Sequence, residues 1–348
     1  MKHQTTRYGE IPFYKIGTFG NTADAFISKK LFLEYKTKYS FPKKGDILIS
    51  ASGTIGRAVI YDGKPAYFQD SNIVWIDNDE TLVKNDFLFY AYSNVKWNTE
   101  HTTILRLYND NFRNTLIPLP SLNEQSAIAN ILSGLDRYLC TLDALILKKE
   151  GVKKALSFEL LSQRKRLKGF NQAWQRVRLG DICEITTGSL DANEMVHYGK
   201  YRFYTCAKEY YFIDKYAFDT EAILISGNGA YVGYVHYYKG KFNAYQRTYV
   251  LDNFSEHIIF VKYFLTMFLQ SHIQTNRNEG NTPYIVMATL KDFEIPLPPL
   301  NEQSAIANIL SALDNEITSL KNKKRQFENI KKALNHDLMS AKIRVLEK

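Results

Sequence analysis

The feature that most constrains this chain is a phrase of nineteen residues that occurs twice. PLPSLNEQSAIANILSGLD occupies residues 118–136 and PLPPLNEQSAIANILSALD occupies residues 296–314, so the copies lie 178 residues apart and agree at 17 of 19 positions. The prolines end whatever precedes them, because proline lacks the N–H that a helix interior or sheet ladder needs. A helix is expected to follow, and Asn123 and Asn301 are its candidate N-caps, since an asparagine side chain accepts from free amide groups.

A long heptad pattern follows each copy. Steps of alternating four and three residues give nine apolar positions of twelve between Ile128 and Leu167, and ten of twelve between Ile306 and Val345. A period of 3.5 residues sustained this long indicates a coiled-coil seam. Each helix is expected to run about 45 residues, roughly 65 Å. Because each helix is apolar on one side only, the two are expected to pack on each other.

A second matched signature lies upstream of each helix. The segments GDILISASGTIGRAVIYDG (residues 45–63) and EAILISGNGAYVGYVHYYKG (residues 221–240) both carry a buried-strand run, ILIS, that meets a glycine turn and an alternating strand. Short helices are expected at residues 84–98 and 258–275. The chain therefore has the pattern of a mixed α/β protein, ordered as globule, long helix, globule, long helix.

The net charge of +9 is unevenly placed. Residues 148–168 and residues 321–348 each carry +6, so these two segments together hold +12 and the remainder holds −3. A basic excess suggests a polyanionic partner. The same basic helix ends have an equally simple interpretation as the solvated face of a coiled coil.

Several classes of protein are disfavoured. No run of about 18 apolar residues predicts a membrane span, and the N-terminus lacks the apolar core of a signal peptide. Cys140, Cys183 and Cys206 fit no metal-ligand spacing, and they are predicted to be reduced thiols of a cytoplasmic protein. The seven histidines form no i, i+4 pair and no cluster with cysteine, so no metal site is predicted.

Catalytic signatures are also weak. The glycines of residues 227–233 have the wrong spacing for a dinucleotide fingerprint, no Walker lysine follows them, and the segment is interpreted as a hairpin turn. NTPY, at residues 281–284, is one residue from the Asn-Pro-Pro-Tyr box of amino-methyltransferases, but no glycine-rich cofactor loop accompanies it. We interpret it as a chance resemblance and predict no catalytic residue and no cofactor.

This layout resembles the specificity subunit of type I restriction–modification enzymes. The residues that carry the resemblance are LGDI…TTG at 179–188, the two ILIS…G hairpins, and the repeated proline-to-helix junction, which together span nearly the whole chain. The resemblance implies two globular target-recognition domains separated by two long antiparallel coiled-coil helices, related by a pseudo-two-fold axis. It also implies a subunit without catalysis of its own, with double-stranded DNA, two methyltransferase subunits and two restriction/translocase subunits as partners, and no membrane.

The corresponding domain boundaries follow the repeat. A first target-recognition domain is expected over residues 1–120, a spacer helix over 121–168, a second domain over 169–299 and a second spacer helix over 300–348. The second domain enters through WQRVRLGDICEITTG at residues 174–188. The first has no counterpart, because RYGEIPFYKI (residues 7–16) aligns best with HYGKYRFYTC (residues 197–206), so it is expected to lack its N-terminal strand.

The side-chain chemistry of the polar loops suggests candidate DNA-binding residues. Base edges are read by Arg, Lys, Asn, Gln and hydroxyl side chains, and phosphates are held by basic, hydroxyl and amide groups. Gln246 and Arg247 suit base edges, whereas Lys239 and Lys241 flank a turn glycine and suit phosphates. A polar loop is often merely solvated, which is the competing interpretation for each residue. The full set is Ser52, Thr54, Arg57, Gln69, Ser71, Asn72, Arg106 and Tyr108 in the first globule, and Asn228, Tyr231, Lys239, Lys241, Gln246, Arg247, Asn276, Arg277 and Asn278 in the second.

The sequence leaves two alternatives open. A stand-alone DNA methyltransferase or nuclease with a built-in reader would bind a cofactor and act alone. A coiled-coil scaffold without a nucleic-acid role would show no salt-dependent DNA binding. For a specificity subunit, each globule is expected to read one half of an interrupted site, with half-sites about 34 Å apart.

Overall fold

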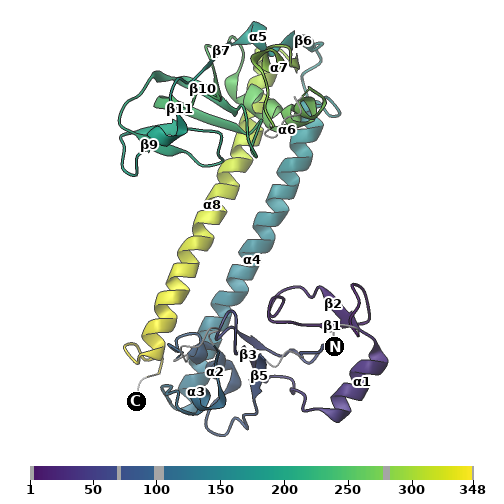
Figure 1. The fold of residues 1–348 in the computed structure, drawn as a ribbon, viewed down its shortest axis with the longest axis vertical. Coiled ribbons are helices and arrows are strands. Elements are labelled where there is room, and N and C mark those ends of the chain that lie inside the picture. Colours follow the sequence, from purple (N-terminus) through teal and green to yellow (C-terminus); the bar gives the residue numbers. More distant parts are fainter. Residues whose placement is uncertain (1–3, 69–71, 98–105, 277–282, 347–348) are drawn as a thin grey trace. The chain divides into compact units, whose positions relative to one another are not determined.

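The computed structural model of the chain describes residues 4–68, 72–97, 106–276 and 283–346, with the side chains of residues 275 and 276 excepted (Figure 1). The structure divides into two compact units. Unit 1 comprises residues 1–144 and 322–348, and unit 2 comprises residues 145–321. Each unit therefore takes one end of each long helix, together with one globule.

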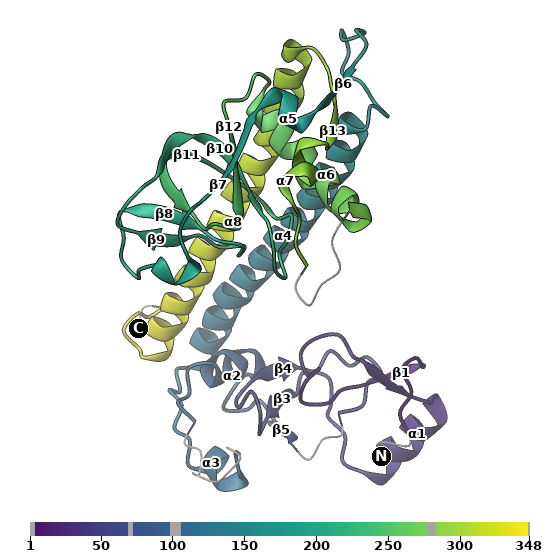
Figure 2. The same cartoon turned by 45° about the horizontal axis from the view of Figure 1, so that its top comes forward.

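The globule of unit 2 is built on a six-stranded sheet of order β7-β12-β10-β11-β8-β9, in which only the β11–β8 pair is parallel. A separate pair, β6-β13, lies beside the short helices α5 and α7 (Figure 2). The elements are β6 (Gln175–Arg178), α5 (Leu179–Ile182), β7 (Glu184–Thr187), the 3₁₀ helix η1 (Ala192–Glu194), β8 (Tyr201–Tyr204), β9 (Tyr211–Ile213), β10 (Phe218–Ser226), β11 (Val235–Ala244), β12 (Thr248–Asp252), α6 (Ile258–Asn276), α7 (Met287–Lys291) and β13 (Glu294–Leu297).

The central strand β10 buries both of its faces. Ile223 and Ile225 pack with α6 and the helix seam in the larger core, whereas Ala222 and Leu224 pack with Tyr204 in a second core on the opposite face. Successive side chains of a strand point to opposite sides, so the run AILI suits a strand covered on both faces. The expected buried strand, glycine hairpin and helix in this globule are confirmed by the structure.

The globule of unit 1 is smaller and holds two sheets. A three-stranded sheet of order β4-β3-β5 packs Ile47 and Ile49 against α2, and the two-stranded sheet β1-β2 packs against α1. The elements are β1 (Ile11–Phe13), β2 (Ala25–Ile27), α1 (Lys29–Lys38), β3 (Ile47–Ser50), β4 (Ala58–Ile60), β5 (Ile73–Ile76), α2 (Asn85–Tyr92) and α3 (Asn109–Arg113). The strands β3, β4 and β5 and the helix α2 occupy the places in unit 1 that β10, β11, β12 and α6 occupy in unit 2.

The long helices are α4 (Leu122–Leu161) and α8 (Leu300–Met339), each of 40 residues. The expected length of about 45 residues was slightly too large, because both helices end about six residues before the heptad pattern does. The cap positions expected at Asn123 and Asn301 were also wrong, although the Asn301 side chain does accept from the Glu302 N–H, at 2.8 Å. Asn123 and Asn301 are the second residues of their helices, and in α4 it is the Ser121 hydroxyl that accepts from the Glu124 N–H, at 3.4 Å.

The two helices run antiparallel within each unit. In unit 2, Lys149 pairs with Glu316 and Lys153 with Asp314; in unit 1, Asp143 pairs with Lys324. The lysines occupy seam positions where the heptad pattern breaks, and each meets a carboxylate of the other helix. The polar seam positions are thus satisfied across the helix pair, while Leu132 and Leu310 are fully buried.

A three-residue network locks the pair to the globule in each unit. In unit 2 the Tyr263 hydroxyl of α6 donates to Asp314 at 2.6 Å, and Lys153 donates to the same carboxylate. In unit 1 the Tyr90 hydroxyl of α2 donates to Asp136 at 2.8 Å, joined by Lys331. Asp136 and Asp314 are the last residues of the repeated phrase, and the lysines also lie 178 residues apart. We call these the seam triads.

A second pair of contacts repeats in the same way. Arg166 holds Glu302 with its Nε and Nη2 atoms, at 3.1 and 2.5 Å, and Arg344 holds Glu124 at 3.2 and 2.7 Å. Both glutamates are buried, and bidentate charge-assisted pairs of this kind are among the stronger hydrogen bonds in proteins. Gln125 is also buried, and its side chain accepts from Lys84 N–H and donates to Leu82 and Pro120 carbonyls.

The seam triad predicts a direct test. Lys153→Met should destabilise unit 2 by about 1–2 kcal/mol, because it leaves the half-buried Asp314 without its cation. Lys321→Met removes a more exposed ion pair with Glu150 and should cost about 0.5 kcal/mol or less. Urea unfolding monitored by circular dichroism measures both. Equal losses from the two variants would show that the triad has no special weight.

The pH dependence of the triad has a defined sign. Burial opposes ionisation of Asp314, but hydrogen bonds from Lys153 and Tyr263 outweigh it and lower its pKa. A lowered folded-state pKa contributes stability that is present above the unfolded value of about 3.9 and is lost as pH falls through the folded value. Asp314→Asn should therefore lower the free energy of unfolding at pH 7, and this difference should shrink as the pH is lowered below about 4. A difference that stays constant down to pH 2 would contradict this assignment.

Candidate nucleic-acid interface

Three segments meet at the end of the central strand of unit 1. The Ala51 N–H donates to the Asn72 carbonyl at 2.6 Å, and the Leu107 N–H donates to the Ala51 carbonyl at 2.7 Å. Ser52 and Arg106 form an isolated β-bridge beside these bonds. The turn after β3, the start of β5 and the segment before α3 are thereby fixed against one another.

Unit 2 has the same arrangement. The Gly227 N–H donates to the Arg247 carbonyl at 2.8 Å, the Ile285 N–H donates to the Gly227 carbonyl at 2.9 Å, and Asn228 bridges Tyr284. A Cβ atom on Gly227 would lie 2.3 Å from the Arg247 oxygen, so the close approach of the two backbones requires glycine here. We call each set of three meeting segments a strand-end junction.

The backbone frames of the two junctions match, but their polar side chains differ. Ser52, Asn72 and Arg106 in unit 1 correspond to Asn228, Arg247 and Tyr284 in unit 2. Hydroxyl, amide and guanidinium groups are the donors and acceptors that read base edges. The two junctions therefore share one backbone frame and present different polar groups.

Unit 1 brings several predicted residues to its junction. Ser52 is buried, Thr54 is exposed in the turn, and Tyr108 is 45% exposed where α3 begins. The Arg57 guanidinium, by contrast, donates to the Phe19 carbonyl at 3.0 Å and so also has a structural role. Gln69 and Ser71 lie outside the described residues.

Unit 2 brings a smaller part of the predicted set together. Asn228 and Arg247 lie at the junction, and Tyr231 lies in the turn that follows β10, with Lys208 5.0 Å from its ring centroid. The Gln246 amide donates to Asp191 at 2.8 Å. Asn276 ends α6, its side chain is outside the described residues, and so are Arg277 and Asn278.

The expectation that Lys239 and Lys241 flank a turn was wrong. Both lie within β11, where Lys239 is opposite Glu221 and Lys241 is opposite Asp219 on β10. Their ammonium groups meet these carboxylates at 3.1 and 3.8 Å. Because β10 continues five residues beyond Glu221 and seven beyond Asp219, Lys239 and Lys241 lie about 17 and about 24 Å along the strand from its junction end.

Sequence reasoning missed an aromatic cluster around Arg202 of β8, formed by Tyr238 of β11 and by Tyr210, which directly precedes β9. The Arg202 guanidinium lies 4.2 Å from the Tyr210 ring and 4.4 Å from the Tyr238 ring. Burial opposes its charge, but hydrogen bonding to the Tyr204 hydroxyl prevails and raises its pKa further. Cation–π contacts of this kind order a surface. The signal available in the sequence was the tyrosine-rich stretch, but spacing alone did not reveal which rings would face Arg202.

Other kinds of site find no support in the described part of the chain. Among those residues, no group of three histidines, cysteines or carboxylates is placed to hold a metal ion. Within the same residues no helix combines the length and hydropathy that crossing a bilayer requires. The three cysteines are unpaired, and burial raises the pKa of Cys183 to about 12.

The chain thus has two equivalent strand-end junctions, each in a globule that is joined to the paired long helices. The chain belongs to the family described as type I restriction modification DNA specificity domain, whose sequence profile matches residues 1–149 and 171–329. This confirms the resemblance to the specificity subunits of type I restriction–modification enzymes that the sequence showed.

Known relatives are similar over parts of this chain. A putative type I restriction enzyme specificity subunit of Haemophilus influenzae is 64% identical over 133 residues, covering 38% of this chain and 34% of the relative. The type I restriction enzyme EcoDI specificity subunit of Escherichia coli is 40% identical over 162 residues, covering 46% and 35%. These matches span about a third of the length of either relative.

The fold is also similar to that of a solved structure. The type I restriction–modification S subunit from M. genitalium matches 97% of this chain and 91% of its own length, with a TM-score of 0.64 and 18% identity. At this identity the likeness concerns the fold alone. It agrees with the expected fold class of two globules and long paired helices.

The junctions themselves predict a contrast between two equivalent serines. The Ser226 hydroxyl is buried and, among the described residues, has no hydrogen-bond partner, whereas the Ser50 hydroxyl donates to the Thr54 carbonyl. Ser226→Ala should be neutral or stabilising by up to about 1 kcal/mol, and Ser50→Ala should destabilise by about 1 kcal/mol. Urea unfolding of both variants checks the contrast. A larger loss from Ser226→Ala than from Ser50→Ala would contradict it.

Proposed function

We propose that this chain is the DNA specificity subunit of a type I restriction–modification complex, in which unit 1 and unit 2 each read one half of an interrupted site. The observation that carries the proposal is the pair of strand-end junctions, which share one backbone frame and differ in their polar side chains. A dimer of identical readers would favour a palindromic site. Two different readers in one chain suit an asymmetric one.

Base readout is assigned to the junctions. In unit 1 the contributing residues are Ser52, Thr54, Asn72, Arg106 and Tyr108; in unit 2 they are Asn228, Tyr231, Gln246 and Arg247. Arg247 is exposed at the end of the sheet, and a guanidinium is the commonest group for bidentate contact with guanine. Arg57, Gln69, Ser71, Asn276, Arg277 and Asn278 remain candidates on the flanking loops.

Phosphate contact is assigned to Lys239 and Lys241. Their present ion pairs are exposed, and exposed pairs contribute little to stability, so exchanging a carboxylate for a phosphate has a small cost. The positions along β11, away from the junction, suit a contact that fixes orientation and does not read sequence.

The repeated phrase is assigned to the docking of two methyltransferase subunits. Its buried members, such as Gln125 and Gln303, are explained by the core. Packing in the core does not explain its exposed members. Asn123 and Asn130 are nevertheless identical to their exposed counterparts Asn301 and Asn308. Two identical exposed surfaces suit two copies of one partner. Two restriction/translocase subunits would complete the complex, and the protein would act in the cytoplasm.

DNA binding gives the first test. Arg247→Ala should weaken binding to the cognate duplex by about 1–3 kcal/mol and relax the preference at one half-site, while Arg106→Ala should relax the other. Lys239→Ala should instead weaken all sequences equally and reduce the slope of affinity against salt by about one. Fluorescence anisotropy with selected and random duplexes distinguishes these outcomes. Binding that ignores both sequence and salt would leave the scaffold alternative, and methyl transfer by the chain alone would favour the enzyme alternative.

The length of the helices is the second test. Insertion of one heptad into both α4 and α8 keeps the seam in register and lengthens each helix by about 10.5 Å. The unspecified spacer between half-sites should then grow by about 3 base pairs, at 3.4 Å per pair. Methylation mapping in cells that carry the complete system measures the spacer. An unchanged spacer would refute the role of the helices as a ruler. Native mass spectrometry of the complex should separately show two methyltransferase subunits per chain.

A further inference from the structure

The segment just before each long helix differs between the units. In unit 2 it is β13, which pairs with β6 in the register Glu294↔Arg178 through Leu297↔Gln175. The next residue, Leu179, donates its N–H to the Phe293 carbonyl at 2.9 Å and is fully buried, and Ile182 is buried beside it. The strand β6 and the turn α5 thus cover β13 and α7.

The same positions of unit 1 are uncovered. Residues 116–119 correspond to β13 at the 178-residue offset, and α3 corresponds to α7 at the same offset. Residues 116–119 form no strand, and among the described residues none donates a hydrogen bond to, or accepts one from, their backbone. Leu119 is 56% exposed, whereas its counterpart Leu297 is 6% exposed.

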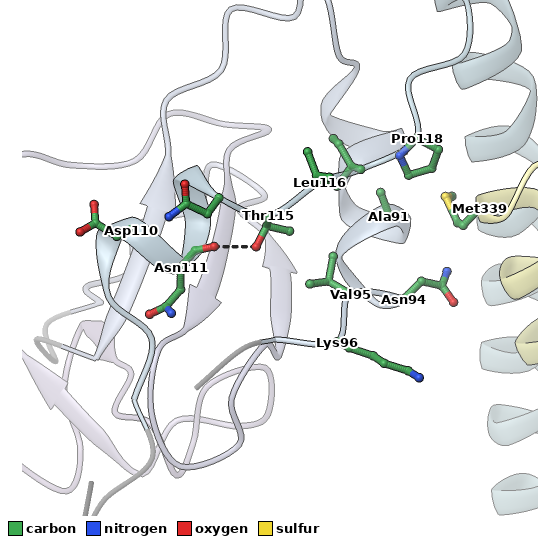
Figure 3. A pocket seen from close by; sticks show the side chains of 12 residues that line it. Ala91, Asn94, Val95, Lys96, Asp110, Asn111, Thr115, Leu116, Pro118 and Met339 are labelled. Carbon is green, nitrogen blue, oxygen red and sulfur yellow. Dashed lines mark hydrogen bonds between the residues drawn. The ribbon is translucent and has the colours of Figure 1, made fainter. Parts of the chain in front are cut away.

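Unit 1 has a cavity beside α3, which is the counterpart of the helix α7 that α5 contacts in unit 2. It measures about 560 Å³ and is bordered by the end of α2, by α3 and by the uncovered segment (Figure 3). Ala91, Val95, Leu116 and Ile117 supply apolar walls, and Thr115, which corresponds to Phe293, lies on the side of α3. In unit 2, Leu179 and Ile182 of α5 belong to the main core together with Leu290 of α7.

A second cavity of unit 1 is lined by the counterparts of residues that contact Trp174 in unit 2. In unit 2 the Trp174 indole N–H donates to Glu302 at 3.2 Å, and its ring meets Phe260 edge-on at 6.0 Å. In unit 1 the counterparts Glu124 and Phe87 border a cavity of about 230 Å³, together with Leu119 and Arg344. Both the apolar wall and the carboxylate acceptor are therefore present there.

We propose that this face of unit 1 is an acceptor for a strand and helical turn with the chemistry of residues 174–182. The strand would pair with residues 116–119, the two aliphatic side chains of the turn would enter the larger cavity, and a tryptophan would donate to Glu124. The inference concerns folding of unit 1 and stands independently of DNA binding.

The experiment compares the full chain with the full chain preceded by a copy of residues 171–190. Amide hydrogen exchange of residues 116–119 and the Tm of unit 1 are measured in both. The extension should slow exchange at these amides by about tenfold or more and raise the Tm, because the acceptor backbone becomes paired and buried. The matched control carries Trp174→Ala, Leu179→Asp and Ile182→Asp in the copied segment and should show neither effect.

A substitution in the acceptor provides a second readout. Leu119→Lys should leave the Tm of the unextended chain nearly unchanged, because this side chain is largely exposed there, and should cancel the gain in the extended chain. Unchanged exchange and Tm on extension would overturn the proposal. Protection already present in the unextended chain, accompanied by a dimer in analytical ultracentrifugation, would also overturn it in favour of a second copy as the occupant. DNA binding through Arg247 is measured in parallel, so a failure here is distinguishable from a failure of the proposed function.

Discussion

The structure depends on a carboxylate at the end of each repeated phrase. Asp136 and Asp314 each accept from a lysine of the opposite long helix and from a tyrosine of the globule. One side chain therefore ties two helices and a globule at a single point. Desolvated charges are costly unless they are paired and hydrogen-bonded, so only one register and one direction of the helices satisfies them. Apolar seam residues alone tolerate several alternatives.

The same dependence explains why the repeated phrase is nearly identical in its two copies. Glu124 and Glu302 hold arginines from the segment that follows the end of the other helix, and Gln125 and Gln303 satisfy backbone groups of the adjacent globule. At one further equivalent position the contacts differ, with Lys149 and Glu316 in unit 2 and the ring pair Tyr138 and Phe327 in unit 1. Contacts that both units make keep the repeated phrase the same in its two copies. Positions that contact only the other helix can differ, provided that the two side chains complement each other.

Much of this fold could be predicted from the sequence because heptads and repeated segments indicate its helices and strands. The heptads gave the long helices, and ILIS with its glycine turn gave β3 and β10. The ends of helices were harder to predict. Residue type favours Asn123 as an N-cap, but Ser121 occupies that position because the proline-containing run ends at Pro120. Lys239 and Lys241 were misplaced because Gly240 suggests a turn, whereas long-range pairing with β10 keeps β11 continuous across it. The junction partners, such as Asn228 with Tyr284, are far apart in sequence, and no local pattern reports their contact.

The division of the chain into units has a consequence for its synthesis on the ribosome. Unit 2 is one uninterrupted stretch, residues 145–321, so all of its contacts are available once that stretch has emerged. Unit 1 is split, since Lys331 and Arg344 reach it from the last part of the chain. The globule of unit 1 is translated first, but part of the helix that it packs against stays uncovered until translation is nearly finished. The order of emergence and the order of completion are reversed, and nascent chains stalled before residue 322 would expose that face to chaperones.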